Sequence, residues 1–285
     1  MIVRTPASSA NIGPGFDTLG MALGLYAEIG LVERGIPDGA RAIDEHHPAS
    51  VAFERNGGDG ALWERTSIPM GRGLGYSGAV RVGGAVLAGA LRTGTTSLDA
   101  DERARAFSLV AELEGHADNV AASLFGGVVA TAAGRVVPVR LGVDPAIVVW
   151  IPSFVTRTDE SRKQLPDVVS LADAAFNLGR LALLVAALGD GDIGALRSAT
   201  EDRLHQPVRL AAAEPSAAAM SAALDAGAWC SWLSGSGPTV AVMCAMADAE
   251  RVAAALPADG RTKVLRIDHA GAVIEPHPDA PARHP

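Results

Sequence analysis

The chain has 285 residues and a net charge of −8, and its basic residues are scattered rather than clustered. This balance argues against a nucleic-acid-binding surface and predicts that an anionic substrate would be held by a few placed cations. With 48% hydrophobic but only 4% aromatic residues, the sequence favours a sizeable core of small side chains, in one large domain or two smaller ones.

The first half of the chain alternates strand-like and helical patterns. Residues 2–4 predict a strand, residues 6–17 are rich in turn-forming residues, and residues 28–33 predict a second strand. Residues 35–60 are loop-like, with a short helix expected at 48–55. The remaining elements are a strand at 62–68, helices at 77–91, 101–114 and 120–124, and a hairpin of strands at 128–131 and 136–141.

The second half begins with a continuous apolar strand at 146–151, where we expect a second unit to start. Helices are predicted at 158–163, 171–188, 192–200, 215–224 and 248–255, a strand–turn–strand at 229–244, and a closing strand at 262–267. This order predicts an α+β protein with domains at 1–145 and 146–275 and a frayed tail at 276–285.

Nothing in the sequence predicts export or a membrane partner. No uninterrupted run of 18 apolar residues is present, and the N-terminal residues do not resemble a signal peptide. Cys230 and Cys244 lie in apolar runs without metal-ligand spacing, so we expect buried, reduced thiols. These observations predict a cytoplasmic protein.

A glycine-rich loop stands between a predicted strand and a predicted helix. It reads Pro69-Met-Gly-Arg-Gly-Leu-Gly-Tyr-Ser-Gly-Ala79. Glycine allows the backbone to approach a ligand closely, and the start of a helix favours an anion, so the loop suits a phosphate. A tight turn without a ligand is the alternative interpretation. No Lys-Ser or Lys-Thr pair follows the last glycine, so this is not a Walker loop.

Several polar residues lie in short segments between apolar elements. Asn11 and Asp17 either cap turns or bind a ligand. Glu112 or Glu114, together with Ser77, could hold Mg²⁺, which prefers hard oxygen ligands. A solvated helix face is the alternative for either glutamate.

A second group of residues could recognise the acceptor. His116 could be a metal ligand, a general base or a substrate partner, but no second histidine lies at zinc spacing. Asp118 could bind an ammonium group, and Arg162 and Arg209 could clamp a carboxylate, although single arginines are often only solvated. Together with the glycine loop, these residues supply what phosphoryl transfer requires: a phosphate cradle, a metal ligand and an acceptor clamp.

Four sequence blocks resemble the GHMP-type small-molecule kinases, and among them most closely the homoserine kinases. The blocks are residues 6–17, the glycine loop at 68–79, residues 114–120 (Glu-Gly-His-Ala-Asp-Asn-Val) and residues 233–239 (Leu-Ser-Gly-Ser-Gly-Pro-Thr). Residues 177–180 and 202–209 also resemble homoserine kinases, so the similarity covers most of the chain. The glycine loop and the 233–239 block indicate only the superfamily, whereas the other blocks are more specific.

The resemblance implies a two-domain GHMP kinase fold. The N-terminal domain would be of the ribosomal protein S5 domain 2 type and the C-terminal domain ferredoxin-like, with ATP and Mg²⁺ bound between them. The implied activity is ATP-dependent phosphorylation of L-homoserine to O-phospho-L-homoserine, for threonine biosynthesis. Relatives are often dimers, so the resemblance leaves a homodimer open.

The resemblance also assigns residues position by position. The acceptor site would be formed by Asn11, Asp17, His116, Asp118, Arg162 and Arg209. The nucleotide would be bound by Gly71, Arg72, Gly73, Leu74, Gly75, Tyr76, Ser77, Gly78 and Ala79. Ser77 and Glu112 would hold the metal, although Glu114 is close enough to take the second role.

Asn119, Thr158 and Arg209 would serve the reaction itself. Asn119 stands where some GHMP kinases carry a catalytic aspartate, and an amide cannot accept a proton as a base. The resemblance therefore implies catalysis by positioning and by charge stabilisation.

Two departures from the family pattern concern the nucleotide end. Tyr76 replaces the first serine of the loop and would either narrow the nucleotide site or point away from it, and Gly78 replaces an alanine. Residues 35–60 form a short segment without the usual Asn-Leu-(Val/Ile) stretch. Two alternatives thus stay open: a GHMP kinase for another small hydroxylated acceptor such as threonine, and a non-catalytic amino-acid-binding relative with an impaired nucleotide site.

Overall fold

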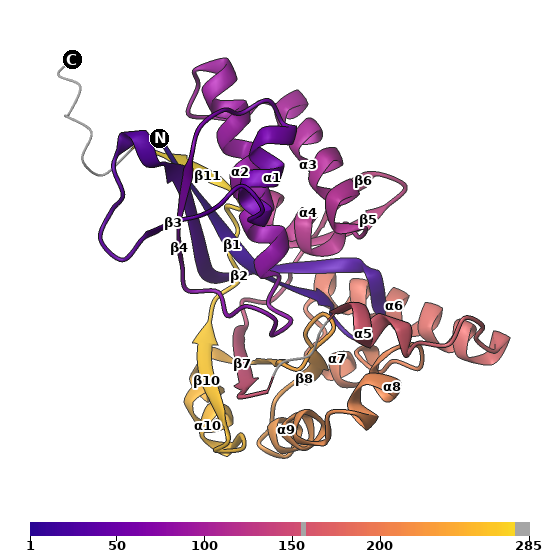
Figure 1. Cartoon of the computed structure of the whole chain (residues 1–285). Helices are drawn as coiled ribbons and strands as arrows, with labels where there is room; N and C mark the ends of the chain where they lie inside the picture. Colours follow the sequence, from indigo (N-terminus) through magenta and orange to yellow (C-terminus); the bar gives the residue numbers. More distant parts are fainter. Residues whose placement is uncertain (155–157, 277–285) are drawn as a thin grey trace.

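Two β-sheets organise the chain in the computed structural model, which describes residues 1–154 and 158–276 (Figure 1). Within these residues the larger sheet consists of β1 (Ile2–Asn11), β2 (Gly15–Leu31), β3 (Arg41–Ala42), β4 (Leu62–Thr66), β5 (Val128–Ala132), β6 (Arg135–Val139) and β11 (Val273–Glu275). The smaller sheet consists of β10 (Gly260–Leu265), β7 (Ala146–Pro152), β9 (Val240–Cys244) and β8 (Cys230–Leu233), antiparallel and in that order.

The long hairpin of β1 and β2 is the centre of the larger sheet. The sequence predicted only the outer parts of this hairpin as strands and expected turns over residues 6–17, which was wrong for most of that segment. β1 continues past Pro6 because a register shift between Pro6 and Ala7 accommodates a residue without an N–H group. Only residues 12–14 form the turn, and Asn11 and Ile12 have positive φ angles of 73° and 46° there.

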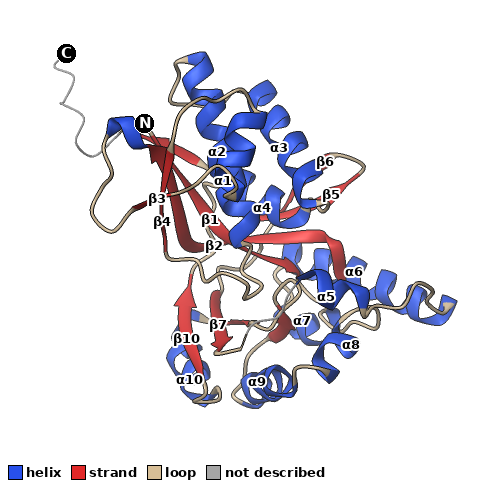
Figure 2. Ribbon diagram, in the orientation of Figure 1, coloured by secondary structure: helices blue, strands red, loops and turns tan. Residues whose placement is uncertain are grey.

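Helices cover one face of this sheet (Figure 2). They are α1 (Pro48–Arg55), α2 (Tyr76–Thr93), α3 (Ala100–Glu114) and α4 (Asp118–Phe125). Gly84 allows α2 to pack closely against α1, because a Cβ at this position would lie 2.1 Å from the carbonyl oxygen of Ala49. Close packing thus explains a glycine that would otherwise only weaken the helix. α2 is the helix that follows the glycine loop, and this tight packing fixes its position.

The second domain packs its helices around β7, whose residues are buried along its whole length. Its alternate side chains enter two cores: Ile147 and Val149 join the main core shared with the first domain, whereas Val148 and Trp150 join a smaller one. The helices are α5 (Thr158–Lys163), α6 (Leu171–Asp190), α7 (Ile193–Ala199), α8 (Gln206–Ala211), α9 (Glu214–Asp225) and α10 (Ala249–Ala255).

Three features of the second half were not foreseen. Residues 206–211, where no element was predicted, form α8, and Pro207 fits there because a proline in the first turn of a helix removes no hydrogen bond. The predicted second domain included residues 273–275, but these form β11 and pair with β1 of the larger sheet. α6 is long and apolar enough, by length and composition alone, to cross a membrane. Residues 277–285 of the predicted tail lie outside the described residues.

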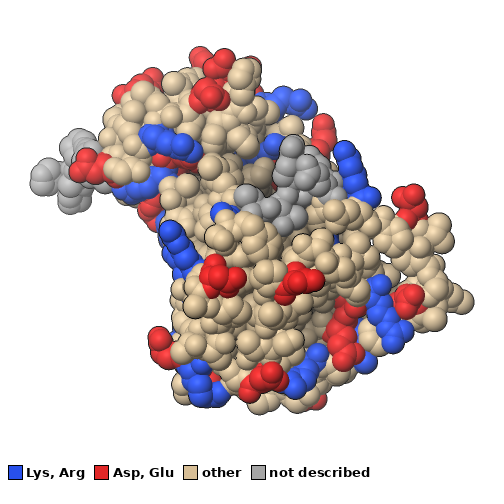
Figure 3. Space-filling view, turned by 60° about the horizontal axis from the view of Figure 1, so that its bottom comes forward, with Lys and Arg blue, Asp and Glu red and all other residues tan. Residues whose placement is uncertain are grey.

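The surface shown in Figure 3 carries acidic and basic side chains interspersed among other residues. The α+β, two-domain architecture predicted from the sequence is thus confirmed. The turn between β1 and β2 meets the turn between β8 and β9, where the side-chain amide of Asn11 donates to the carbonyl oxygen of Gly235, and this contact brings polar segments of the two domains together.

Candidate active site

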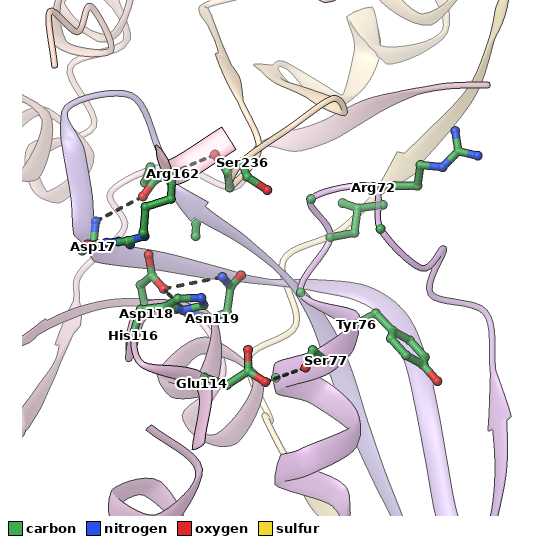
Figure 4. A pocket seen from close by; sticks show the side chains of 18 of the residues that line it. Asp17, Arg72, Tyr76, Ser77, Glu114, His116, Asp118, Asn119, Arg162 and Ser236 are labelled. Carbon is green, nitrogen blue, oxygen red and sulfur yellow. Dashed lines mark hydrogen bonds and ion pairs between the residues drawn. The ribbon is translucent and has the colours of Figure 1, made fainter. Parts of the chain in front are cut away.

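A cavity of about 450 Å³ is lined by residues of both domains (Figure 4). The predicted acceptor residues Asn11, Asp17, His116, Asp118, Arg162 and Arg209 all line it, and so do residues 71–78 of the glycine loop and Asn119. Ala79 lies behind the loop and is fully buried. The side chain of Thr158, at the start of α5, lies outside the part of the chain that the structure describes.

The glycine loop needs its glycines for contact with the rest of the protein. Gly73 has φ 72°, and a Cβ there would lie 2.2 Å from the carbonyl oxygen of Ser234, which follows β8. Gly75, the residue before α2, has φ 66°, and a Cβ there would meet the Ser8 hydroxyl at 2.0 Å. α2 therefore starts without a capping side chain, and its positive end faces the cavity.

Arg72 joins this loop to the second domain. Its guanidinium donates hydrogen bonds to the carbonyl oxygens of Pro152, at the end of β7, and of Phe154, the latter at 2.7 Å. The Ser234 hydroxyl also donates to the carbonyl oxygen of Gly73 at 2.6 Å. These contacts hold the loop between the two domains without using the backbone N–H groups of the loop.

Tyr76 directs its hydroxyl away from the acceptor residues (Figure 4). The hydroxyl donates to Glu64 of β4 at 2.8 Å and lies 3.0 Å from Nε2 of His47. Nδ1 of His47 accepts from the N–H of Ala49, so the tautomer with a proton on Nε2 completes the network. Burial alone would raise the pKa of Glu64, but hydrogen bonds from His47, Arg41 and Tyr76 outweigh it and lower the pKa to about 2.

The candidate metal ligands are Ser77 and Glu114, not Ser77 and Glu112. The Ser77 hydroxyl donates to Oε1 of Glu114 at 2.5 Å, whereas Glu112 has a side chain 72% exposed and faces Arg55. The sequence assigned this role to Glu112 with Glu114 as the alternative, and of the two Glu114 lies beside Ser77, because these glutamates lie two residues apart on α3 and so point to different sides of the helix. Arg81 also contacts Oε1 of Glu114, at 2.9 Å from its Nε.

This donor set fits a magnesium ion that is bound mainly by phosphates and water. Mg²⁺ in nucleotide sites typically takes one or two protein oxygens, and a carboxylate beside a hydroxyl supplies them. No group of three or more His, Cys, Asp or Glu side chains suited to a metal is found among residues 1–154 and 158–276. A nucleotide-bound magnesium therefore suits the site better than a metal held by protein ligands alone.

His116, Asp118 and Asn119 lie together where α3 gives way to α4. Nδ1 of His116 lies 3.4 Å from Oδ1 of Asp118, and this contact raises the pKa of His116 although burial opposes it. Asp118 is 2% exposed and also accepts a hydrogen bond from the backbone N–H of Asn119 at 2.7 Å. The side-chain oxygen Oδ1 of Asn119 accepts a hydrogen bond from the Ser8 hydroxyl at 2.9 Å, so the side-chain amide is fixed beside the glycine loop.

Asp17 and Arg162 face each other from different domains. Nη2 of Arg162 lies 2.5 and 2.8 Å from the two carboxylate oxygens of Asp17, whose φ is 54°. The side chain of Asn11 links the same turn to the second domain, because its amide nitrogen donates to the carbonyl oxygen of Gly235 at 2.9 Å. Both contacts join the β1–β2 turn to the smaller domain across the cavity.

Arg209 is a buried cation, 6% exposed, at the wall of the cavity. Its Nη1 donates to the carbonyl oxygen of Gly235 at 3.2 Å and lies 3.0 Å from Nδ1 of His205. Its Nε has no hydrogen-bond partner within the described residues. Burial and the nearby Arg162 lower the pKa of Arg209. A buried, partly unpaired guanidinium of this kind is ready to bind an anion.

His205 and Asp202 hold Arg209 in place, and the sequence did not single them out. His205 is fully buried, and its Nε2 lies 2.8 Å from the carbonyl oxygen of Gly13 in the β1–β2 turn. Because Nδ1 faces the Arg209 guanidinium, Nε2 must carry the proton and donate it to Gly13. Asp202 accepts the backbone N–H groups of His205 and Gln206 at the start of α8. The spacing of four residues between His205 and Arg209 is the signal that could have indicated this pair.

Comparisons with known proteins agree with this geometry. Residues 42–127 match the GHMP kinases N terminal domain and residues 184–262 match the GHMP kinases C terminal domain. The chain is 40% identical over 267 residues to a homoserine kinase of Moorella thermoacetica, covering 85% of this chain and 87% of that protein. It is 42% identical over 258 residues to a homoserine kinase of Mycolicibacterium vanbaalenii, covering 82% and 81%.

A solved structure shares the fold along nearly the whole chain. The homoserine kinase from Cytophaga hutchinsonii superposes with a TM-score of 0.81 at 24% identity, covering 95% of this chain and 96% of that one. Sequence relatives above 30% identity over most of both chains and the two matching domain families lead to the same conclusion. The chain therefore belongs to the homoserine kinase family of the GHMP kinases.

Proposed function

We propose that this protein transfers the γ-phosphoryl group of ATP to the side-chain hydroxyl of L-homoserine, giving O-phospho-L-homoserine and ADP in the cytoplasm, for threonine biosynthesis. The observation that carries the proposal is the charge arrangement in one cavity: buried Arg209 and exposed Arg162 line it together with Asp17 and Asp118, and Arg162 pairs with Asp17. This arrangement suits a small zwitterion beside a phosphate loop.

The two ends of the amino acid would be recognised by opposite charges. The acceptor carboxylate would bind Arg209, whose Nε is unpaired, with Arg162 as a second cation. The ammonium group would bind Asp118, with His116 and Asn11 at its sides. Arg162 now pairs with Asp17, so substrate binding would exchange part of that ion pair for contacts with the ligand.

The phosphates would bind at the start of α2 and the glycine loop. The backbone there supplies N–H groups and the positive end of a helix 18 residues long, and Arg72 fixes the loop from the side. Mg²⁺ would be held by Ser77 and Glu114 and would neutralise charge on the phosphates. Tyr76 keeps its hydroxyl on Glu64, so the loop backbone stays available.

The chemical step forms a bond between the homoserine oxygen and the γ-phosphorus and breaks the bond between that phosphorus and the β–γ bridging oxygen. The hydroxyl proton passes to solvent as ADP leaves. Asn119 lines the cavity but cannot accept that proton. The residues therefore act by positioning the acceptor and stabilising charge, as a loose phosphoryl transition state requires.

A coupled assay of ADP release tests the proposal. L-homoserine, L-threonine, L-serine and D-homoserine would be compared at saturating ATP and Mg²⁺, and the product identified by ³¹P NMR. We expect the highest kcat/KM for L-homoserine. Turnover with threonine alone would support the second kinase alternative instead.

The non-catalytic alternative rests on Tyr76, whose ring lines the nucleotide end of the cavity. Isothermal titration with the non-hydrolysable analogue AMP-PNP and Mg²⁺ separates it from the kinase proposal. Homoserine binding without nucleotide binding would favour an amino-acid sensor. Binding of both ligands to one molecule would reject the sensor.

A further inference from the structure

Arg81 is a cation in the wall of the cavity that has no part in the proposed binding of acceptor, phosphate or metal. It lies on α2 four residues after Ser77, so the two side chains share one face of the helix. Its Nη1 donates to the carbonyl oxygen of Leu113 at 2.8 Å. A cation in the first two turns of a helix gains nothing from the helix dipole, so another group must balance its charge.

The balancing group is the candidate metal ligand Glu114. Nε of Arg81 lies 2.9 Å from Oε1 of Glu114, and the Ser77 hydroxyl donates to the same oxygen at 2.5 Å (Figure 4). Oε1 is thus the oxygen of Glu114 that stands beside the second candidate ligand. A metal ion held by Ser77 and Glu114 would lie next to the Arg81 guanidinium, and the two cations would repel each other.

The contact between Arg81 and Glu114 is an ion pair without an aligned hydrogen bond at Nε. Although it lies 2.9 Å from Oε1, this nitrogen has no hydrogen-bond partner within the described residues. The Glu114 side chain is only 9% exposed, so an unbalanced carboxylate there would be costly. Arg81 therefore supplies the positive charge that Glu114 needs when no metal is bound, and it does so through a contact that a metal could replace.

A second ion pair between the same two helices has the features of a structural tie. Nη2 of Arg92, in the last turn of α2, donates to Oε2 of Glu102 in the first turn of α3 at 2.5 Å. Nη1 of Arg92 donates to the carbonyl oxygen of Asn56 at 2.7 Å. Arg92 thus fastens α2 to α3 away from the cavity, with aligned hydrogen bonds on both sides. The pair at the cavity differs from it because its glutamate is also a candidate metal ligand.

We propose that Arg81 makes metal binding depend on the nucleotide. In the free protein the guanidinium neutralises Glu114, so Ser77 and Glu114 offer no net negative charge to a divalent cation. A nucleotide at the glycine loop brings phosphate charge, which balances Arg81 and leaves the carboxylate to the metal. Arg81 acts through Glu114 and is therefore a positioning residue. The inference rests on the metal site of the proposed function.

This arrangement selects the metal together with the nucleotide over the free metal. One carboxylate and one hydroxyl make a weak site for Mg²⁺ unless phosphates add further oxygens, and the neighbouring cation weakens it more. The coupling between two bound ligands is mutual, so the metal must improve nucleotide binding by the same factor. Without Arg81, the free ion would meet an unbalanced carboxylate at Glu114 and would bind there before the nucleotide.

Binding of Mn²⁺ to the full chain, measured by electron paramagnetic resonance in the absence of homoserine, tests the proposal. In the wild type, AMP-PNP should raise the affinity for Mn²⁺ by about 100-fold, after correction for Mn²⁺ bound to AMP-PNP in solution. Arg81→Gln should raise the affinity for Mn²⁺ alone by at least about tenfold, because a neighbouring positive charge is lost. With AMP-PNP present, the affinity of this variant should stay within about threefold of wild type, so the coupling falls.

Three further variants separate the charge of Arg81 from its structural contacts. Arg81→Lys keeps the charge and should leave the affinity for Mn²⁺ alone within about threefold of wild type. Arg92→Gln is the matched control on α2 and should change neither affinity by more than about twofold. The gain from Arg81→Gln should disappear when it is combined with Glu114→Gln, because the effect passes through this carboxylate.

An unchanged or lower affinity of Arg81→Gln for Mn²⁺ alone would overturn the proposal, because Arg81 would then only hold Glu114 and the end of α3 in place. Equal affinity of the wild type for Mn²⁺ with and without AMP-PNP would overturn it as well, and this measurement needs no variant. Circular dichroism of each variant checks the fold. Homoserine takes no part in the experiment, so a failure to phosphorylate homoserine would reject the proposed function without changing this result.

Discussion

The two ends of the proposed active-site cavity offer different groups to a ligand. The proposed acceptor end offers charged side chains from separate segments, among them Asp17, Asp118, Arg162 and Arg209. The proposed nucleotide end offers the backbone of one glycine loop and the start of α2. Contacts made by backbone groups do not depend on the side chain, so the loop should tolerate Tyr76 where the family pattern has serine, whereas the acceptor end should tolerate few changes. The predictions below test this difference.

Removal of Arg209 should have the largest effect. Arg209→Ala would remove the buried cation at the acceptor end, and truncating one partner of a buried charge pair costs about 2–5 kcal/mol, or about 30- to 3000-fold in kcat/KM for homoserine. Steady-state kinetics would measure this loss, with most of it in KM for homoserine. Affinity for AMP-PNP should be unchanged.

Arg197→Ala is the matched control for this variant. Arg197 is an exposed arginine on α7 whose guanidinium donates to the carbonyl oxygen of Leu224. Its substitution by alanine should leave kcat/KM for homoserine within about twofold of the wild-type value, as for most surface substitutions. An unchanged KM for homoserine in a folded Arg209→Ala protein would contradict the acceptor assignment.

Substitution of two glutamates of α3 tests which of them is a metal ligand and which is only solvated. Glu114→Gln should raise the Mg²⁺ concentration for half-maximal activity by at least about tenfold, because an anionic ligand beside Ser77 is lost. In Glu112→Gln this Mg²⁺ concentration should stay within about twofold of the wild-type value, since the Glu112 side chain is 72% exposed. Mn²⁺ binding in the presence of AMP-PNP, followed by electron paramagnetic resonance, gives a readout independent of turnover. Equal effects of both substitutions would reject Glu114 as the ligand.

The pair of His116 and Asp118 gives a test by titration. Asp118 raises the pKa of His116 above its ordinary value of 6.5, while burial acts in the opposite direction. With a raised pKa, the stabilisation from this pair is complete below pH 6.5 and is lost as the pH rises through the folded-state pKa. Asp118→Asn removes the hydrogen bond and the charge of Asp118, so the pKa of His116 should fall, with burial still lowering it and the charges of Glu114 and Asp17 still raising it. NMR titration of the His116 ring protons measures it, and an unchanged pKa would mean that the pair is not formed.

The sequence predicted the parts of the site that lie in single segments. The glycine loop, the 114–120 block and the 202–209 run each have a recognisable local pattern, and the site residues predicted in them line one cavity, except for the buried Ala79. Glu112, which lies outside these segments, does not line the cavity. The choice between Glu112 and Glu114 depends on the rotation of α3 relative to Ser77, and this rotation is set by helix packing rather than by local sequence. The same holds for His205, whose partner Gly13 lies 192 residues away.

Parts of the fold were not predicted because they also depend on contacts between distant segments. β1 is buried on both faces, so its small residues Ala7 to Ala10 show no alternation from which a strand could be read. β11 has only three residues and gains its stability from pairing with β1 at the other end of the chain. Strong local patterns, such as the 48–55 helix with its proline in the first turn, were predicted with correct bounds.

Tyr76 should give the smallest effect on activity. Tyr76→Phe keeps the ring and the loop backbone but removes the hydroxyl that binds Glu64, so we expect kcat/KM for ATP to stay within about threefold of wild type. Stability should fall by about 1–2 kcal/mol, because the nearly buried carboxylate of Glu64 loses a hydrogen bond. Urea unfolding at pH 7 measures this loss.

The pH dependence identifies Glu64 as the partner of Tyr76. The pKa of Glu64 is lowered to about 2 from an ordinary value of 4.5, so its stabilisation is present above pH 4.5 and is lost as the pH falls toward 2. Loss of the Tyr76 hydrogen bond should leave the pKa of Glu64 less lowered in Tyr76→Phe, so the difference in stability between the two proteins should be constant above pH 4.5 and should shrink as the pH falls from there toward 2. A difference that stays constant as the pH falls toward 2 would mean that the Tyr76 hydroxyl stabilises the protein through a contact other than ionised Glu64. A large loss of activity would mean that the nucleotide end also depends on side chains, and the contrast between the two ends of the cavity would no longer hold.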